Sequence, residues 1–453
     1  MVAQSRQGPR SPREVEDFAM TPPSRPRRPV SRRRLLQTTA LALPGAWALA
    51  ACARDQPLSG PTGAASSAGG SASGSGAPSP SAIPIASPQN PVKWPINPGN
   101  EPIASGLEPE ANATLRIYNY PDYIDKSVLK GFEKEYADYN VSIELSTFND
   151  YPEALTKIRT GGVPFDLTFL SYNYMGRLVY GDLIRPLNHE YIPNMAANIW
   201  EEFQNPFYDL EWQYTVPYTI YTTGIGWRSD LIPENIGARP NPYDVFWDSK
   251  YAGEIAVLDD EREVIGMTIL RDGGTNVNTE DPAVLGAARD AMLEMLSLSQ
   301  PRVTITGYTD IPEGVMSLSQ CWSGDMLAAI NYLPQDVDAS TLRYWFPQDG
   351  LGLVNNDFMC ILKGGENPVL AHHFLNYMLT NEASLANLSW NGYQPPLKML
   401  TPETMVADGY IPENLKEAVV LPEWFVAGYP ILELPPDVEA EYQAIWQQFK
   451  AGA

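Results

Sequence analysis

Apolar residues in the body of the chain recur with two periods that alternate along the sequence. Leu115 and Ile117 lie two residues apart, which predicts a strand with one buried face. Helical spacing follows at once, over Val128, Leu129, Phe132 and Tyr136. A strand over 141–145, a helix that begins at Asp150 and a strand over 165–170 continue the series. This βαβαβ pattern predicts a parallel sheet covered on both faces, and hence an α/β fold.

The same alternation extends through the second half of the body. The pattern predicts strands over 223–227, 254–258, 326–330 and 358–362, and helices over 264–270, 282–298, 368–379 and 437–450. No internal repeat accompanies these elements. A body of this length suits two α/β lobes better than one large sheet.

An acidic turn, Asp259 to Val264, lies where the strand over 254–258 becomes a helix. In open α/β sheets ligands bind beyond the carboxyl ends of the strands, so carboxylates at this junction are candidates for holding a cation. Asp260 and Glu263 are three residues apart and share a face of the first helical turn. The same spacing is that of a capping box, and both interpretations stay open on these residues alone.

The first 51 residues have the features of an export signal. Ser31 to Gln37 (Ser-Arg-Arg-Arg-Leu-Leu-Gln) resembles a twin-arginine motif, and the weakly apolar stretch after it is too short and interrupted for a stable membrane span. Leu49-Ala50-Ala51-Cys52 resembles a lipobox, which makes Cys52 the expected lipidation site and mature N-terminus. The basic lead-in is long, so we expect translation to start at Met20 rather than Met1.

Residues 52–110 are dominated by Ser, Gly, Ala and Pro, with few side chains to bury. We therefore expect a disordered tether that carries the body away from the membrane to which Cys52 anchors it. After Cys52 only Cys321 and Cys360 remain, and we expect them to be free thiols, because proteins exported by the twin-arginine route fold in a reducing cytoplasm.

Charge and missing motifs exclude several classes of function. Nine arginines and three acidic residues precede Cys52, so that segment carries +6 and the remainder −29 of the net −23. Such an acidic body argues against nucleic acid as a partner and mildly for cationic ligands. The chain has three histidines and no zinc, P-loop, dinucleotide or nucleophile-elbow motif. We expect no metal, no cofactor and no catalytic residues.

Aromatic residues are dense at the ends of the predicted strands. They are Tyr118, Tyr120 and Tyr123 after the first strand, Tyr172 and Tyr174 after the third, and Trp322 before a later one. Each one singly is better explained by packing. Their shared position at strand ends favours a ligand site lined by rings.

Separated motifs in the body resemble those of the solute-binding lipoproteins of bacterial polyamine ABC importers. The matching stretches are 117–123, 165–171, 217–226, 259–264, 321–325 and 391–393. The resemblance implies a two-lobed clamshell of the periplasmic-binding-protein type II class, each lobe a mostly parallel sheet flanked by helices. Lobe 1 would comprise 111–222 plus 355–400, and lobe 2 would comprise 223–354 plus 401–453.

The resemblance also implies the ligand-binding residues. Tyr120, Tyr123 and Trp322 would form aromatic walls, Asp260, Glu263 and Asp357 would hold ammonium groups, and Ser171 and Tyr393 would add polar contacts. The implied protein is a monomer, lipid-anchored on the outer face of the cytoplasmic membrane, that delivers a polyamine or another small organic cation to importer permease subunits. Aromatic rings and carboxylates suit a chain of methylenes that ends in ammonium groups.

Four positions depart from the pattern of the family. They are Pro121, Asn173, Asn355 and Phe425. The departures favour a putrescine-like diamine or another organic cation over spermidine. Two alternatives remain: a ferric-ion or other small-solute binding protein of the same fold, in which Tyr172 and Tyr174 would pair on the iron, and a secreted glycosidase with two catalytic carboxylates.

Overall fold

A computed structural model describes residues 83–452. The predicted export signal, the lipidation site Cys52 and residues 53–82 of the predicted tether lie outside the described residues. Within residues 83–452, every helix is too short or too polar to cross a membrane.

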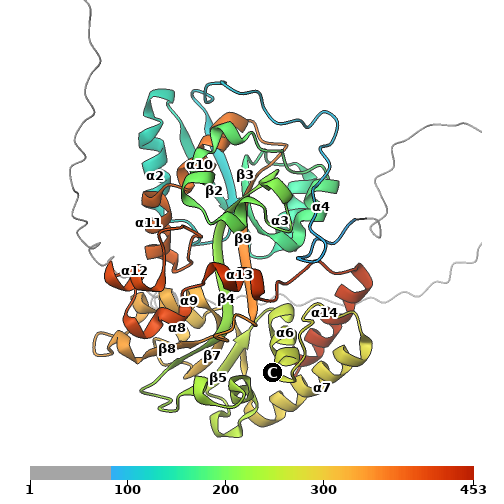
Figure 1. The fold of residues 1–453 in the computed structure, drawn as a ribbon, viewed down its shortest axis with the longest axis vertical. Coiled ribbons are helices and arrows are strands. Elements are labelled where there is room, and N and C mark those ends of the chain that lie inside the picture. Colours follow the sequence, from blue (N-terminus) through green and yellow to red (C-terminus); the bar gives the residue numbers. More distant parts are fainter. Residues whose placement is uncertain (1–82, 453) are drawn as a thin grey trace, which may run out of the picture. The chain divides into compact units, whose positions relative to one another are not determined.

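One mixed sheet of nine strands organises the described chain (Figure 1). Eight strands follow the order β2-β1-β3-β9-β4-β7-β5-β6, and β8 pairs with β4 off this path. The strands are β1 (Thr114–Asn119), β2 (Ser142–Thr147), β3 (Leu167–Ser171), β4 (Thr215–Arg228), β5 (Ile255–Leu258), β6 (Arg302–Thr304), β7 (Leu318–Trp322), β8 (Leu342–Trp345) and β9 (Leu353–Ile361).

Lobe 1, as we use the name, is the group of elements around the parallel strands β2, β1 and β3. Helix α2 (Lys126–Glu135) connects β1 to β2, and α3 (Tyr151–Thr160) connects β2 to β3, as the hydrophobic periods predict. Asp150 caps α3 by accepting a hydrogen bond from the Glu153 amide. Helix α4 (Met175–Tyr180) follows β3, and α10 (Pro368–Met378) and α11 (Asn381–Asn391) follow β9.

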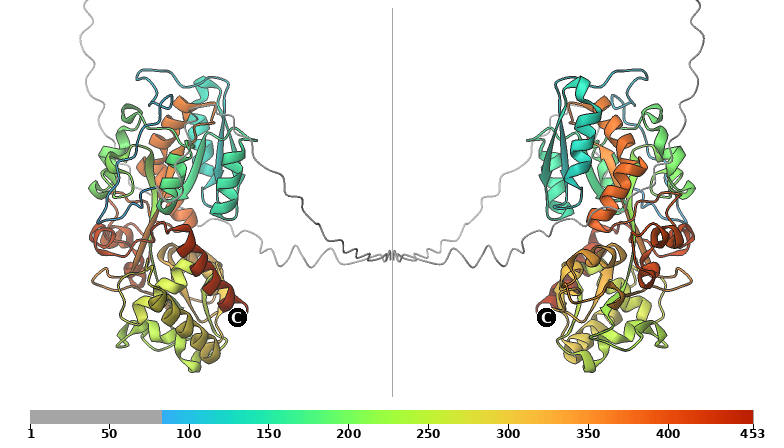
Figure 2. Two further views of the ribbon diagram at one scale, coloured as in Figure 1. Left: turned by 90° about the vertical axis from the view of Figure 1, so that its right-hand side faces the viewer. Right: turned by 90° about the vertical axis from the view of Figure 1, so that its left-hand side faces the viewer.

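Lobe 2 is the group of elements around β5, β6 and β7. Helices α6 (Glu261–Arg271) and α7 (Pro282–Ser299) follow β5, and Figure 2 shows the C-terminal helix α14 (Pro436–Lys450) lying along them. The remaining helices are α5 (Pro193–Asn198), α8 (Gly307–Asp310), α9 (Ser323–Ala328), α12 (Pro402–Ala407) and α13 (Pro422–Ala427).

Two long antiparallel strands, β4 and β9, run between the lobes (Figure 1). Strand β4 pairs with β9 from Thr215 to Thr223, and with β7 from Thr223 onward. The change of partner falls at Thr223. Because both strands pass through without interruption, they fix the position of any side chain that they carry between the lobes.

Two sequence predictions are wrong. The predicted strand over 326–330 lies in α9 and the 3-10 turn that follows it, and the strand is β7, directly before them. A short apolar run can be a buried helix as well as a strand, and here Met326 and Leu327 are buried in a helix. Both cysteines of the body are free and buried, as expected.

The predicted tether is also wrong for its last part, because residues near Trp94 pack on lobe 1. The Trp94 ring is 2 % exposed, and its Nε1 donates to the Tyr208 carbonyl oxygen at 2.6 Å. Val92 exchanges backbone hydrogen bonds with Phe207 and Leu210. A single tryptophan supplies the buried apolar surface that the surrounding composition lacks.

Candidate functional site

The floor of the candidate site is one face of the β4–β9 pair. Asn355 and Asp357 are two residues apart on β9 and therefore point to the same face. Their partners across the ladder are Tyr221 and Thr219 of β4. Asn355 and Asp357 are both buried. The face thus offers a carboxylate and an amide, about 6.6 Å apart along the strand, where the lobes meet.

Asp357 accepts hydrogen bonds from two tyrosine hydroxyl groups. The Tyr123 hydroxyl donates to Oδ2 at 2.8 Å and also lies 2.8 Å from the Thr219 hydroxyl. The Tyr151 hydroxyl reaches Oδ1 at 3.3 Å. Burial raises the pKa of Asp357 to about 6, and the tyrosine hydroxyls oppose that rise. The carboxylate is therefore mostly ionised at neutral pH although it is buried.

Asp260 is the N-cap of α6, which confirms the capping interpretation of the acidic turn. Its Oδ1 accepts from the amides of Arg262 at 2.9 Å and Glu263 at 3.1 Å. Burial raises the pKa of Asp260, while these amide bonds lower it. The cap also orients the first turn of α6, and thereby the side chain of Glu263.

Glu263 does not complete a capping box but points toward the floor of the site. Its Oε1 accepts from Trp322 Nε1 at 3.1 Å and from Asn355 Nδ2 at 3.4 Å. Its Oε2 is buried without a hydrogen-bond partner. Burial, followed by the nearby Asp260 charge, raises the pKa of Glu263 to about 8. This carboxyl group is largely protonated at neutral pH unless a cation joins it.

Asn355 connects this end of the site to the chain behind it. Its Oδ1 accepts from the Tyr172 hydroxyl at 2.6 Å and from the Ile431 amide at 3.0 Å. Its Nδ2 donates to Glu263, so both polar atoms of the Asn355 amide group have a partner. The residue is therefore held in one orientation at the Glu263 end of the floor.

Aromatic rings line the region between the two carboxylates. Tyr120 contacts Tyr123 and Tyr151 with ring centroids 6.0 and 5.4 Å apart, and Tyr151 contacts Tyr174 at 4.7 Å. A second set joins Tyr393 to Tyr123 at 5.6 Å and to Tyr221 at 5.7 Å, with Trp322 6.2 Å from Tyr221. All but Trp322 of these rings belong to tyrosines.

The last two residues predicted for ligand binding are Tyr393 and Ser171. The Tyr393 hydroxyl donates to Oδ1 of Asp325 at 3.1 Å, and burial raises the pKa of Asp325 to about 7. Ser171 ends β3 opposite Asp357, and its hydroxyl lies 3.4 Å from the Asn356 carbonyl oxygen. Ser171 therefore stands beside the floor but bonds to the backbone.

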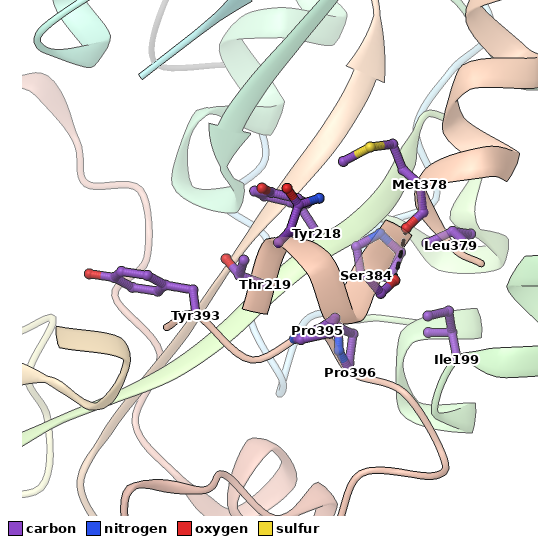
Figure 3. A pocket seen from close by; sticks show the side chains of 11 residues that line it. Ile199, Tyr218, Thr219, Met378, Leu379, Ser384, Tyr393, Pro395 and Pro396 are labelled. Atoms are coloured by element: carbon purple, nitrogen blue, oxygen red, sulfur yellow. Dashed lines mark hydrogen bonds between the residues drawn. The ribbon is translucent and has the colours of Figure 1, made fainter. Parts of the chain in front are cut away.

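A cavity of about 10 Å³ lies directly behind the site (Figure 3). It is lined by Tyr218, Thr219 and Tyr393 on the side of the site, and by Ser384 and Asn387 of α11 on the other. Its volume is about that of one water molecule, and Asn387 Nδ2 is a buried donor without a partner. The cavity is too small for an organic ligand.

Of the eight side chains predicted for ligand binding, six make contacts within the site: Tyr120, Tyr393 and Asp357 each contact Tyr123, and Glu263 bonds to Trp322. The Asp260 side chain caps α6, and the Ser171 hydroxyl bonds to the backbone. The structure adds Tyr151, Tyr221 and Asp325, for which the sequence held only weak signals: Tyr151 opens a predicted helix, and Tyr221 precedes a predicted strand. Arg262, within the acidic turn, does not bond to the floor of the site. Instead its guanidinium lies over the Tyr442 ring at 4.9 Å and donates to the Leu432 carbonyl oxygen.

Metal binding has no support in the described residues. Among residues 83–452, no group of three His, Cys, Asp or Glu side chains is placed to hold a metal ion. Tyr172 and Tyr174, the pair considered for iron, have different surroundings. The Tyr172 hydroxyl bonds to Asn355, whereas Tyr174 packs on Tyr151 and under the guanidinium of Arg177.

Comparison with known proteins assigns the family. The family model described as bacterial extracellular solute-binding protein matches residues 127–412, which is more than half of the chain. The spermidine/putrescine-binding periplasmic protein of Salmonella typhimurium is 26 % identical over 347 residues, covering 75 % of this chain and 92 % of the relative. A putrescine/agmatine-binding protein of Pseudomonas aeruginosa is 24 % identical, covering 76 % and 93 %.

Solved structures show the same fold. A spermidine/putrescine ABC transporter substrate-binding protein from Streptococcus pneumoniae aligns with a TM-score of 0.61 and 25 % identity, over 75 % of this chain and 99 % of that one. A putative spermidine/putrescine ABC transporter protein from Listeria monocytogenes aligns with a TM-score of 0.63 and 25 % identity, over 74 % and 98 %. The predicted two-lobed periplasmic-binding-protein type II fold is thereby confirmed.

Proposed function

The chain belongs to the bacterial extracellular solute-binding proteins, and on that premise we propose that it captures a polyamine between its lobes and delivers it to an ABC importer. It is a binding protein, not an enzyme. Relatives named for binding spermidine, putrescine or agmatine support this ligand class. The observation that carries the proposal is Glu263 Oε2, a buried carboxylate oxygen without a partner in a site rich in acids and rings.

Electrostatics favour a cation at this site. Glu263, Asp325 and Asp357 are buried and Asp260 is half-buried, and burial raises the pKa of each. Arg262, the basic residue within the acidic turn, bonds away from the floor to Leu432 and Asn278. A ligand ammonium would pair with the buried carboxylates, which otherwise bear the whole desolvation penalty.

The length of the floor between Asn355 and Asp357 favours a short diamine. Asn355, which touches Glu263, and Asp357 are about 6.6 Å apart along β9. A chain of four methylenes between two ammonium groups spans five bonds, or roughly 6 Å, whereas the terminal amines of spermidine are roughly 11 Å apart. Because Asn355 is bonded on both sides, it closes the Glu263 end against a longer chain.

Calorimetry of the purified protein against putrescine, cadaverine and spermidine tests the proposal. We expect at least one amine to bind more tightly than about 10 μM, and the diamines to bind better than spermidine. Glutamate, maltose and ferric ion serve as controls. The proposal would be refuted if no amine bound and glutamate or maltose did. A visible charge-transfer colour on adding ferric ion would favour the iron alternative.

The glycosidase alternative is tested by an activity assay. Turnover of a glycoside that disappears in Glu263→Gln would establish a carboxylate-pair enzyme and overturn the assignment of the site to binding.

We further propose that Cys52 is lipidated after twin-arginine export, and that the protein acts as a monomer on the outer face of the membrane. The sequence motifs at 31–37 and 49–52 support this localisation. Mass spectrometry of the membrane fraction should find diacylglyceryl on Cys52. The Cys52→Ala variant should lose that modification and leave the membrane fraction, and unchanged membrane retention would contradict the anchor.

A further inference from the structure

Arg177 forms an ion pair between the lobes. Its Nε lies 2.9 Å from Glu433 Oε1, and its Nη2 lies 2.7 Å from Glu439 Oε2. Arg177 is on α4, whose apolar residues pack with Tyr118 and Phe165 in the core of lobe 1. Glu439 is on α14, whose apolar residues pack with α6 in the core of lobe 2. One guanidinium thus joins helices from two different hydrophobic clusters.

The surroundings of this ion pair bury it in part. The side chains of Arg177, Glu433 and Glu439 are 26 %, 12 % and 32 % exposed. Next to Arg177, Gly176 allows close approach, because a Cβ there would lie 2.5 Å from Ile83 Cγ2 and 2.9 Å from Glu433 Oε2. Partial burial weakens screening by salt without removing it, so the bridge from Arg177 to two carboxylates is worth more than an exposed ion pair.

The same guanidinium contacts the ligand site. It lies 5.6 Å from the centroid of the Tyr174 ring, and Tyr174 packs on Tyr151, whose hydroxyl reaches Asp357. A continuous row of contacts therefore joins the carboxylate on the floor to the ion pair between the lobes. A ligand that orders Tyr151 and Tyr174 would also hold Arg177 in the position that meets Glu433 and Glu439.

We propose that Arg177 is a positioning residue for ligand capture: it fastens the lobes together through Glu433 and Glu439 and, through Tyr174, couples that fastening to occupancy of the site. The role rests on the proposed function only in its link to the ligand. Closure is driven by contacts that exist in the closed state alone, and this ion pair is such a contact, because separating α4 from α14 breaks it.

The test compares Arg177→Gln with a matched control, Arg239→Gln. Arg239 also bridges two carboxylates, with Nε 2.6 Å from Glu234 and Nη2 2.9 Å from Asp248, but all three residues belong to lobe 2. Both variants lose a partly buried arginine that bridges two carboxylates, and only Arg177→Gln loses a bridge between lobes. Putrescine affinity and dissociation rate, and the radius of gyration of the ligand-free protein by small-angle scattering, are measured for each.

We expect Arg177→Gln to weaken putrescine binding at least about fivefold, mainly through faster dissociation, and to increase the radius of gyration of the ligand-free protein. Raising the salt concentration should weaken binding by the wild type more than by this variant. Arg239→Gln should lower thermal stability while its affinity stays within twofold of the wild type.

A folded Arg177→Gln variant with wild-type affinity and wild-type radius would overturn the proposal, as would an equal loss of affinity in Arg239→Gln. If Arg177→Gln does not fold, Glu439→Gln removes the same contact from the lobe 2 side and is judged by the same criteria. If the wild type binds no amine, the proposed function fails, and the radius of gyration by itself still decides whether Arg177 fastens the lobes.

Discussion

The carboxyl groups at the two ends of the site, Asp357 and Glu263, have different hydrogen-bond partners. Asp357 lies on the rigid β4–β9 floor, where hydroxyl groups donate to both of its oxygens. Glu263 lies on the first turn of α6, where two N–H groups donate to one oxygen and the other has no partner. Burial raises the pKa of Asp357 to about 6 and that of Glu263 to about 8.

The difference shows that equal burial does not give equal charge. Hydroxyl groups on both oxygens of Asp357 stabilise its anion, so it presents a charge before the ligand arrives. Glu263 becomes charged only when an ammonium replaces its proton. In the proposed function, Asp357 would attract and hold one end of a diamine, and Glu263 would be satisfied by the other end.

Replacement of Asp357 by Asn should have the largest effect on affinity. The variant removes the charge that is present at neutral pH and leaves a ligand ammonium unpaired, so we expect a loss of about 2–5 kcal/mol in amine binding. Titration calorimetry at pH 7 measures it. Asp209 provides a control, because it is equally buried in lobe 1 but bonds to the backbone of Tyr214 and Thr215. Asp209→Asn should lower the stability of the protein and leave its affinity for amines unchanged.

Replacement of Asn355 by Ala should break the connection between the two ends. It leaves the Tyr172 hydroxyl and the Ile431 amide without a partner and removes one of the two hydrogen bonds to Glu263, so the free energy of unfolding should fall by about 2 kcal/mol in urea titrations. It also opens the Glu263 end, and the ratio of spermidine to putrescine affinity should rise. An unchanged ratio would show that Asn355 does not limit ligand length.

Replacement of Glu263 by Gln should cost about 1 kcal/mol of binding at pH 7, less than at Asp357, because the carboxyl group is already largely protonated. Cation binding requires its proton to leave, so wild-type affinity should rise at least about tenfold from pH 6 to pH 8 and then level off. In Glu263→Gln this rise should shrink to about twofold, the part that comes from Asp357 with its pKa of about 6. A variant that keeps the full pH dependence would show that another group titrates.

The same pKa has a consequence for the ligand-free fold. A carboxyl group whose pKa is raised on folding contributes stability at low pH and loses it as the pH rises through the folded value. The ligand-free wild type should therefore lose stability between about pH 5 and pH 8, and putrescine should restore it. Thermal unfolding across this range, with Glu263→Gln as the comparison, measures the effect.

The smallest effects should come from the hydroxyls on Asp357. Tyr123 donates at 2.8 Å and Tyr151 at 3.3 Å, so Tyr123→Phe should cost about 1 kcal/mol of binding and Tyr151→Phe about half as much. Both variants should also raise the pKa of Asp357, and the acid limb of the pH dependence should shift upward. An effect at Tyr151 larger than that at Tyr123 would contradict the ranking.

Much of the fold followed from periodicity. The alternation at 115–117 and the helical spacing at 128–136 correspond to β1 and α2, and the helix predicted over 282–298 ends one residue short of α7. The error at 326–330 arose because a short apolar run fits either a strand or a buried helix. The tether prediction was wrong near Trp94, since composition averages over the few residues that anchor the segment.

The sequence by itself determined the local structure, the position of the acidic turn at a strand end, and the family to which the motifs belong. The tertiary structure alone decided that Tyr151 faces Asp357, that Asn355 bonds to Glu263, and that Arg177 meets Glu439. Periods of two and 3.6 residues are local properties of the backbone. Burial and hydrogen-bond partners depend on atoms more than 90 residues apart, as with Glu263 and Asn355. They appear only when the chain is folded.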